Sequence, residues 1–250
     1  MWLRVLAVLV CFLAAACDRA GPLDGLDQGE RGRVVRVLDG DALVLDTGQS
    51  VRLIGIEAPA GPYRDRQGEP FHEEAKRMLE DMALGREVQL VYAGLTRDRY
   101  DRALAHVRTI DALGPDLWLN AEMLKRGGAR MRIYPDTALG SENFAGFEAD
   151  ARKAGLGVWA LPAYRIALAE NLPDDFARFQ LVEGVVGAMR GTDDFGTVCN
   201  LALAGSQLVL AVRTGAAPHC QLAEGRRVLA RGYVRDGKME ISHTLDLEPL

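Results

Sequence analysis

One stretch of the chain carries more structural information than any other: VRLIGIEAP, residues 51–59. Its Val, Leu and Ile residues are the types enriched in β-strands. Arg52 interrupts this apolar run. A charged residue is seldom enclosed in a strand without a partner. Arg52 is therefore better explained by function than by packing, although a solvated arginine at a strand end is the simpler alternative.

Patterns on either side of this stretch predict a small barrel. Runs rich in Val, Leu and Ile indicate strands, and apolar residues at 3–4 spacing indicate helices. The predicted strands are 33–38, 41–46, 50–56, 87–93 and 103–110, and the predicted helices are 71–84, 117–125 and 142–154. Three strands, a helix, two strands and two helices are the order expected of a five-stranded barrel with three helices. The predicted class is α+β, mainly β.

The remainder of the chain predicts a second, smaller domain. Residues 161–176 carry Pro162 and Pro173 and are interpreted as a linker. Five further β-type runs follow, at 179–186, 197–203, 207–212, 227–234 and 239–241. Gly-rich turns separate these runs, and Asp236-Gly237 suits a hairpin. We therefore expect residues 177–250 to form a small all-β, OB-like domain that carries no recognisable catalytic set.

Several blocks of the first domain resemble the staphylococcal (micrococcal) nuclease family, also called thermonucleases. In order they are VLDGD at 37–41, VRLIGIEAP at 51–59 and DRYDRALA at 98–105. LNAEMLKRGGA at 119–129 and EADARKAGLGVW at 148–159 are similar to the family's later helices. The resemblance implies that residues 32–160 form the family's OB-like barrel.

The same resemblance implies a calcium-dependent phosphodiesterase. Asp41 and Glu57 match the family's two metal carboxylates, the second usually an aspartate, and Ala58 supplies a backbone carbonyl. Calcium takes oxygen ligands of these kinds. Arg52 and Arg102 match the two catalytic arginines, whose guanidinium forks bind phosphate oxygens in pairs. Without the resemblance, Asp41 would be an ordinary turn residue.

Three more residues are candidates for holding single-stranded DNA or RNA. Arg99 and Tyr100 match the family's Lys-Tyr pair beside the substrate phosphate. Tyr134 offers a ring on which a base could stack. It is equally compatible with a place in the core.

One member of the family's set is absent. Ala60 stands where the family has the glutamate thought to act as general base. Alanine cannot accept a proton, and such assistance is typically worth about 100- to 10,000-fold in rate. Asp65 or Glu69 in the following loop could replace it, or Glu57 could act as base instead of metal ligand.

The sequence therefore leaves more than one function open. One is an exported nuclease with weakened or rearranged base chemistry. Another is a catalytically inactive, nuclease-like binding or scaffold lipoprotein, favoured by Ala60, by the appended β-domain and by a near-neutral charge of 17 Lys and Arg against 16 Asp and Glu over residues 31–135. That charge is not typical of a protein that binds nucleic acid through many phosphate contacts. A purely structural envelope lipoprotein is a third reading, and nothing in the sequence indicates an oligomeric state.

The beginning of the chain is typical of an export signal. A positive start, an apolar run at 5–13 and the small residues 14–16 precede Cys17. The run is shorter than the roughly 20 residues that a membrane-spanning helix needs. We expect residues 1–16 to be removed, Cys17 to carry a lipid and residues 17–31 to form a Gly- and Asp-rich tether. The protein would then be periplasmic or anchored to the membrane by this lipid; plain cleavage after the alanines is the alternative.

Two cysteines remain beyond this segment. An exported chain meets an oxidising compartment, so Cys199 and Cys220 are expected to form a disulfide. Two small buried thiols are the alternative.

Overall fold

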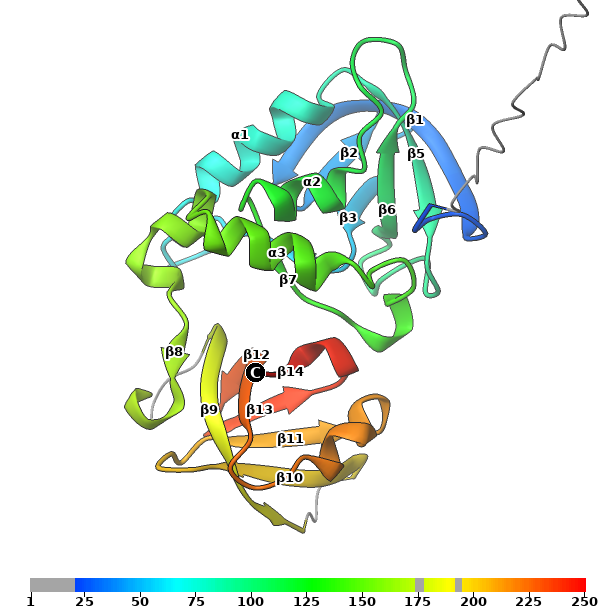
Figure 1. Cartoon of the computed structure of the whole chain (residues 1–250). Coiled ribbons are helices and arrows are strands. Elements are labelled where there is room, and N and C mark those ends of the chain that lie inside the picture. Colours follow the sequence, from blue (N-terminus) through cyan, green and yellow to red (C-terminus); the bar gives the residue numbers. More distant parts are fainter. Residues whose placement is uncertain (1–20, 174–177, 192–194) are drawn as a thin grey trace, which may run out of the picture.

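The structure, a computed structural model, describes residues 21–173, 178–191 and 195–250. Figure 1 shows two barrels, one above the other, with α3 lying on the side of the upper barrel that faces the lower one. The predicted signal peptide and Cys17 lie outside the described residues. Among those described, no helix is both long and apolar enough to cross a membrane.

Within residues 27–109, five strands close the first barrel. In order around it they are β1 (Asp27–Asp39), β2 (Ala42–Leu45), β3 (Ser50–Leu53), β6 (Ala103–Thr109) and β5 (Glu87–Tyr92). Neighbours are antiparallel except β3 and β6, which are parallel. Inward-facing residues such as Leu43, Val51 and Leu90 are fully buried and form the core. The predicted barrel is therefore confirmed.

Helices cover this barrel. In the described part of the chain the α-helices are α1 (His72–Ala83), α2 (Leu119–Lys125) and α3 (Phe144–Lys153). The predicted apolar face of α1, including Ala75 and Leu79, packs against the barrel core. Asn120 of α2 is buried, donates to the Ile54 carbonyl at 2.8 Å and accepts the Val107 N–H at 2.9 Å. These bonds fasten α2 to the parallel pair that closes the barrel.

Short elements complete the first domain and the connection. β4 (Ile56–Glu57) and β7 (Arg130–Met131) form a two-stranded antiparallel ribbon. The short 3-10 helices of the described residues are η1 (Pro135–Thr137), η2 (Gly157–Ala160), η3 (Pro162–Tyr164), η4 (Ala169–Asn171), η5 (Thr214–Gln221) and η6 (Thr244–Asp246).

The barrel begins earlier than predicted. β1 starts at Asp27, which pairs with Tyr92 of β5. Close by, the Glu30 carboxylate accepts hydrogen bonds from Tyr92 and Arg97. The prediction of a tether over residues 17–31 is therefore wrong from Asp27 onward. Composition alone suggested a loop, but ladder hydrogen bonds to β5 hold this segment in the sheet.

The second barrel repeats the connectivity of the first. Within residues 178–191 and 195–250, its strands in order are β9 (Phe179–Arg190), β10 (Thr197–Leu203), β11 (Val209–Arg213), β13 (Lys238–Ile241) and β12 (Arg227–Arg235). The pairing of β12 with β9 closes it, and β11 runs parallel to β13. At its margins lie β8 (Ala167–Leu168) and β14 (Leu247–Pro249). Because β8 pairs with β9, part of the predicted linker 161–176 belongs to this sheet.

Buried ion pairs and hydrogen bonds join the two barrels. Arg231 of β12 is 2% exposed and pairs with Glu148 of α3, which also accepts the Met131 N–H at 2.7 Å. Arg130 is 3% exposed and donates to the Phe179 carbonyl at 3.1 Å. A buried charge is costly without a partner. These contacts therefore tie the second barrel to α3 and β7.

A disulfide joins Cys199 of β10 to Cys220 of η5. Cys199 lies in the core of the second barrel, and Cys220 packs against that core. The cysteines are 21 residues apart. A loop of this length is expected to contribute about 3 kcal/mol by restricting the unfolded chain.

The buried residue His106 predicts a pH dependence of stability. Its ring meets Trp118 and Phe144 edge-on, and Nε2 donates to the Leu139 carbonyl at 2.8 Å. Burial lowers its pKa from 6.5 to about 4. The unfolded chain therefore takes up a proton that the folded protein resists, so stability present above pH 6.5 is lost as the pH falls toward 4.

Through His106 alone, we expect the free energy of unfolding to fall by about 2 kcal/mol between pH 7 and pH 5. Urea unfolding of the wild type and of His106→Gln at both pH values measures this. Glutamine keeps a donor for Leu139 but does not titrate, so the variant should lack that part of the change. Equal pH dependence in the two proteins would contradict the assignment.

Candidate active site

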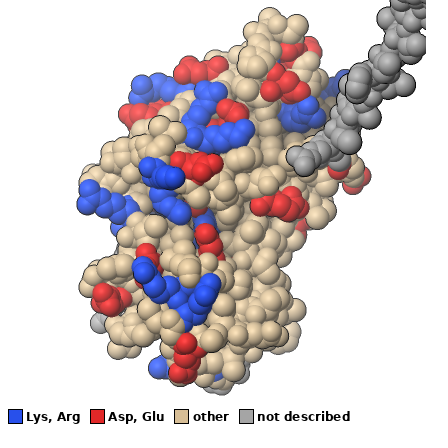
Figure 2. Space-filling view, in the orientation of Figure 1, with Lys and Arg blue, Asp and Glu red and all other residues tan. Residues whose placement is uncertain are grey.

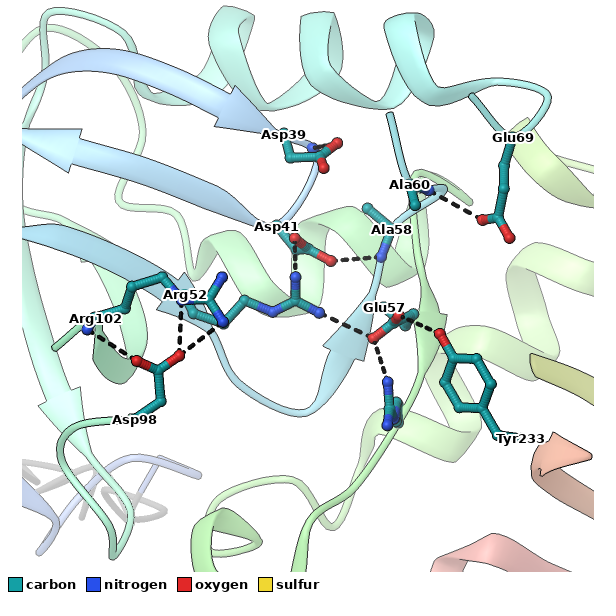
Figure 3. Close-up of polar contacts among 12 residues, drawn as sticks. Asp39, Asp41, Arg52, Glu57, Ala58, Ala60, Glu69, Asp98, Arg102 and Tyr233 are labelled. Carbon is teal, nitrogen blue, oxygen red and sulfur yellow. Dashed lines mark hydrogen bonds and ion pairs between the residues drawn. The ribbon is translucent and has the colours of Figure 1, made fainter. Parts of the chain in front are cut away.

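Arg52 has the anionic partners that its place in an apolar strand requires. It lies within β3, opposite Ala42 of β2 and Leu104 of β6. Figure 3 shows its guanidinium between two carboxylates. It donates to Asp41 Oδ1 at 2.6 Å and to Glu57 Oε2 at 2.9 Å. Residues 51–59, which predicted the barrel, therefore also contribute Arg52 at the centre of a charged cluster.

Asp41 is enclosed behind Arg52, at 2% exposure. A turn through Gly40 leads from β1 to β2 and sets the position of Asp41. A Cβ on Gly40 would lie only 2.7 Å from the Ala58 Cβ and 2.9 Å from the Ala75 Cβ, so glycine permits this close approach. The second oxygen of Asp41 accepts the Ala58 N–H at 2.7 Å.

The two carboxylates differ in their affinity for a proton. Burial raises the pKa of Asp41 to about 7, although Arg52 and the Ala58 N–H favour its ionised form. Burial also acts to raise the pKa of Glu57, but Arg52 and Arg132 outweigh it and hold that pKa below its usual value. Burial opposes the charge of Arg52, yet both carboxylates raise its pKa. Arg52 is thus a fixed cation beside one firmly ionised carboxylate and one that titrates near neutrality.

Two residues without a predicted role complete the cluster. Arg132, just after β7, donates to Glu57 Oε2 at 3.0 Å, and the Tyr233 hydroxyl of β12 donates to Glu57 Oε1 at 3.1 Å (Figure 3). The Arg132 guanidinium lies 4.5 Å from the centre of the Tyr233 ring. Alternating basic and apolar residues at 130–134 are a local signal for Arg132. Tyr233 lies 176 residues from Glu57, and no local pattern links them.

A tight turn presents Arg102. The Asp98 carboxylate accepts the N–H groups of Tyr100 and Arg102 at 2.9 and 3.0 Å, and the Arg102 Nε at 2.7 Å. Asp101 completes the turn with a positive φ of 61°. The Arg102 side chain remains 34% exposed. Asp98, for which the motif suggested no role, therefore orients an arginine that a ligand can reach.

A cavity of about 670 Å³ brings most predicted site residues together. Its lining includes Arg52, Glu57, Arg99, Tyr100, Arg102, Arg132 and Tyr134. Tyr100 is 66% exposed and lies beside the guanidinium groups of Arg99 and Arg102. Tyr134 is 47% exposed and lies 4.6 Å from the Arg132 guanidinium. Exposed rings beside cations suit a phosphate with its base. Asp41 and Ala58 are absent from this lining.

Ala60 borders a different cavity, of about 380 Å³, together with Asp39 and His72. Its N–H donates to Glu69 Oε2 at 3.0 Å. Figure 3 shows Glu69 on the side of Ala60 away from Arg52. Glu69 also lies 3.9 Å from Arg130. Its carboxylate thus holds the loop and is not directed at the arginine cavity.

The other proposed replacements for the missing base are also poorly placed. Asp65 lines neither of these cavities. Glu57 is engaged by Arg52, Arg132 and Tyr233, and its lowered pKa makes it a weak base. None of the three replacements suggested by the sequence, Asp65, Glu69 and Glu57, is therefore a strong substitute for a glutamate at position 60.

This arrangement does not fit a calcium ion as it stands. Among the described residues, no group of three His, Cys, Asp or Glu side chains could hold a metal. Each oxygen of Asp41 and of Glu57 accepts a hydrogen bond from a donor of the chain itself. A cation held by both carboxylates would have to displace the Arg52 guanidinium.

Comparison with known proteins points to the same domain. A family model described as "Staphylococcal nuclease homologue" matches residues 50–161. The thermonuclease of Staphylococcus intermedius is 30% identical over 135 residues, covering 53% of this chain and 77% of the relative. The micrococcal nuclease of Shigella flexneri is 34% identical over 139 residues, covering 53% and 75%. The chain belongs to the staphylococcal nuclease family.

A thermonuclease from Staphylococcus hyicus, 28% identical over 131 residues, covers 51% of the chain and 75% of its own length. The staphylococcal nuclease match ends at residue 161, before the second barrel begins. That barrel nonetheless places Tyr233 against Glu57 of the nuclease domain. The cluster is therefore built from family residues and from a part of the chain beyond the family match.

Removing the Tyr233 hydroxyl should raise the pKa of Glu57. In Tyr233→Phe the ring beside Arg132 remains, but Glu57 loses one hydrogen bond to its ionised form. A hydrogen bond to a charged group is worth about 1.5 kcal/mol, so the pKa of Glu57 should rise by roughly one pH unit. Carbon-13 NMR titration of the Glu57 carboxyl measures this. An unchanged pKa would show that Tyr233 does not act on Glu57.

Proposed function

We propose that the protein is a nuclease that hydrolyses phosphodiester bonds of single-stranded DNA or RNA. One observation carries the proposal: Arg52, Arg99 and Arg102 line the same cavity as two exposed tyrosines. Guanidinium groups bind phosphate oxygens through paired hydrogen bonds. Exposed rings receive bases that are free to stack, as they are in single strands. The nuclease relatives support this reading.

The two predicted catalytic arginines have distinct positions. Arg102 is the more accessible, and Asp98 holds its orientation. Arg52 lies deeper, so a phosphate oxygen would share it with Asp41 and Glu57. Cationic donors fixed before the reaction stabilise charge that develops on the phosphoryl oxygens. We assign this task to Arg52 and Arg102, and substrate binding to Arg99, Tyr100 and Tyr134.

We extend the proposal to a calcium requirement. The staphylococcal nuclease family is generally calcium-dependent. Asp41, Glu57 and the Ala58 carbonyl are donors of the kind calcium takes. If a divalent ion were held there, it would supply charge stabilisation and an activated water. Since Arg52 occupies the space between the carboxylates, calcium binding would require this arginine to move.

A second candidate function is binding without hydrolysis. Ala60 favours it, because no strongly basic carboxylate replaces the missing glutamate at the arginine cavity. In that case the cavity would hold a single strand at the cell envelope without cutting it. Weakened hydrolysis and pure binding differ in whether any turnover depends on the arginines.

We also propose that the protein is exported and held at the membrane by a lipid on Cys17. The apolar start of the sequence and the small residues before Cys17 support export. The disulfide between Cys199 and Cys220 agrees with an oxidising compartment.

The first test is cleavage of single-stranded DNA by the purified protein, with calcium and with a chelator. We expect calcium-dependent cleavage that falls at least about 100-fold in Arg102→Ala, since loss of one fixed donor typically costs that much. Arg102 is preferred to Arg52, whose removal would leave two enclosed carboxylates without their partner. Arg36→Ala, an exposed arginine outside both site cavities, is the matched control.

Equal activity in the wild type and in Arg102→Ala would overturn the nuclease proposal. Binding of the DNA with no cleavage would instead support the second candidate. Cleavage that survives the chelator would retain the nuclease and reject the calcium requirement.

Restoring a carboxylate at position 60 should raise the rate. General-base assistance is worth about 100-fold or more, so Ala60→Glu should increase kcat by that order if the remaining site is competent. Ala60→Gln has nearly the same size without the charge and is the control. If both variants have wild-type kcat, the site lacks more than its base.

A further inference from the structure

The second barrel has the connectivity of an oligonucleotide-binding barrel. Its third and fifth strands, β11 and β13, pair in parallel, as β3 and β6 do in the first barrel. OB-type barrels use the face of their second and third strands, with the adjoining loops, to bind oligonucleotides or oligosaccharides. Connectivity alone assigns no ligand. The side chains that line the barrel must therefore indicate which ligand it binds.

Of the second and third strands only the third, β11, lines a cleft of about 1030 Å³ between the barrels, together with β12 and β13. β11, β12 and β13 contribute Arg213, Tyr233, Arg235, Lys238 and Glu240 to the lining. Residues 132–136, which follow β7, contribute to it from the nuclease domain. The cleft is thus built by both barrels.

The cleft adjoins the active-site cavity. Arg132, Tyr134 and Asp136 line both. At this boundary the Arg132 guanidinium lies 4.6 Å from the Tyr134 ring and 4.5 Å from the Tyr233 ring. A strand with one phosphate at Arg102 would pass Arg132 and reach the second barrel.

Basic side chains dominate the wall that the second barrel provides. Arg235 and Lys238 are exposed and face each other on either side of the Asp236-Gly237 turn that joins β12 to β13. Figure 2 shows Lys and Arg side chains on the lower barrel, with Asp and Glu side chains beside them. A phosphate backbone requires such positive charge along its path.

The acidic side chains of the lining are mostly compensated. Glu240 pairs with Arg213 at 2.9 Å. Asp246 accepts two backbone N–H groups, and burial raises its pKa to about 6. Asp136 lines the cleft near its boundary with the active-site cavity. The lining carries five basic and three acidic side chains, and three of the basic ones, Arg132, Arg213 and Arg231, are themselves paired with carboxylates.

An exposed aromatic ring stands at the edge of the cleft. Phe195 is fully exposed, and its carbonyl accepts a hydrogen bond from Arg213 at 2.9 Å. The next residue, Gly196, lines the cleft. A ring in this position adds nothing to the core, but it offers a stacking platform for a base.

We propose that the cleft between the barrels binds the continuation of a single-stranded nucleic acid whose scissile phosphate lies at Arg102. The inference rests on the proposed nuclease function and specifies its substrate as a strand long enough to span both barrels. Arg235 and Lys238 contact the phosphates, and Tyr233 and Phe195 contact the bases. The second barrel therefore selects for strand length, while the nuclease domain holds the reacting bond.

Fluorescence anisotropy of the full chain tests this, with labelled single-stranded DNA of about 4 and about 16 nucleotides, the range of OB-barrel site sizes. Chelator is present, and gels confirm that the DNA stays intact. We expect Arg235→Ser/Lys238→Ser to weaken binding of the long strand about tenfold and to lower the slope of log Kd against log salt by about 1.4, the value for two lost phosphate contacts. Binding of the short strand should change less than twofold.

Two comparisons separate charge from stacking and from folding. Arg36→Ser/Arg77→Ser removes two exposed arginines that line neither cavity and should leave both strands unaffected. Phe195→Ser should weaken long-strand binding without changing the salt slope.

If Arg235→Ser/Lys238→Ser changes long-strand binding no more than the Arg36→Ser/Arg77→Ser control does, the proposal is overturned. Displacement of the long strand by polyglutamate at an equal concentration of charge would also overturn it, because the cleft would then recognise acidic peptides. If Arg102→Ala abolishes cleavage while the cleft variant binds normally, the nuclease stands and the cleft assignment fails. If neither the wild type nor any variant cleaves DNA, but the cleft variant loses the tighter binding of the long strand, the cleft assignment stands and the nuclease proposal fails.

Discussion

The site depends on one interaction, the double ion pair of Arg52 with Asp41 and Glu57. Two carboxylates this close repel each other, and burial makes each costly to ionise. Arg52 offsets part of this cost at Asp41 and, together with Arg132, outweighs it at Glu57. The four groups sum to zero formal charge. The turn between β1 and β2, strand β3, strand β4 and the segment after β7 each supply one of them, so folding of this barrel also assembles its charges.

Local patterns predicted the parts of this arrangement that depend on neighbours in sequence. Apolar runs and turns located the barrel strands, and 3–4 spacing located α1. Arg52 stood out because it interrupts an apolar strand. Arg132 and Tyr233 did not stand out, because their roles come from contacts between distant segments. An arginine after a short strand and a tyrosine in an amphipathic strand have ordinary explanations until the barrels are placed together.

The misplaced start of β1 has a related cause. Gly and Asp are common in residues 17–31 and favour a loop when the chain is considered alone. The structure supplies what composition cannot show, an open edge of β5 with which Asp27 and its successors pair. Similarly, Ala167 and Leu168 of the predicted linker pair with β9. A strand added at the margin of a sheet needs hydrogen-bonding partners more than it needs a strong sequence pattern.

The second barrel and the missing base affect different stages of the reaction. Contacts made along the cleft would be equally strong for the bound strand and for its transition state, so they lower KM without raising kcat. A general base acts only as the phosphorus–oxygen bond changes, so under the proposed nuclease function the alanine at position 60 would lower kcat. Tighter binding by the second barrel therefore cannot compensate for Ala60. Tyr233 is the exception, since its hydroxyl acts on Glu57 while its ring lines the cleft. Through it, and through Arg132, which also lines the cleft and donates to Glu57, occupation of the second barrel could alter the charge balance around Arg52.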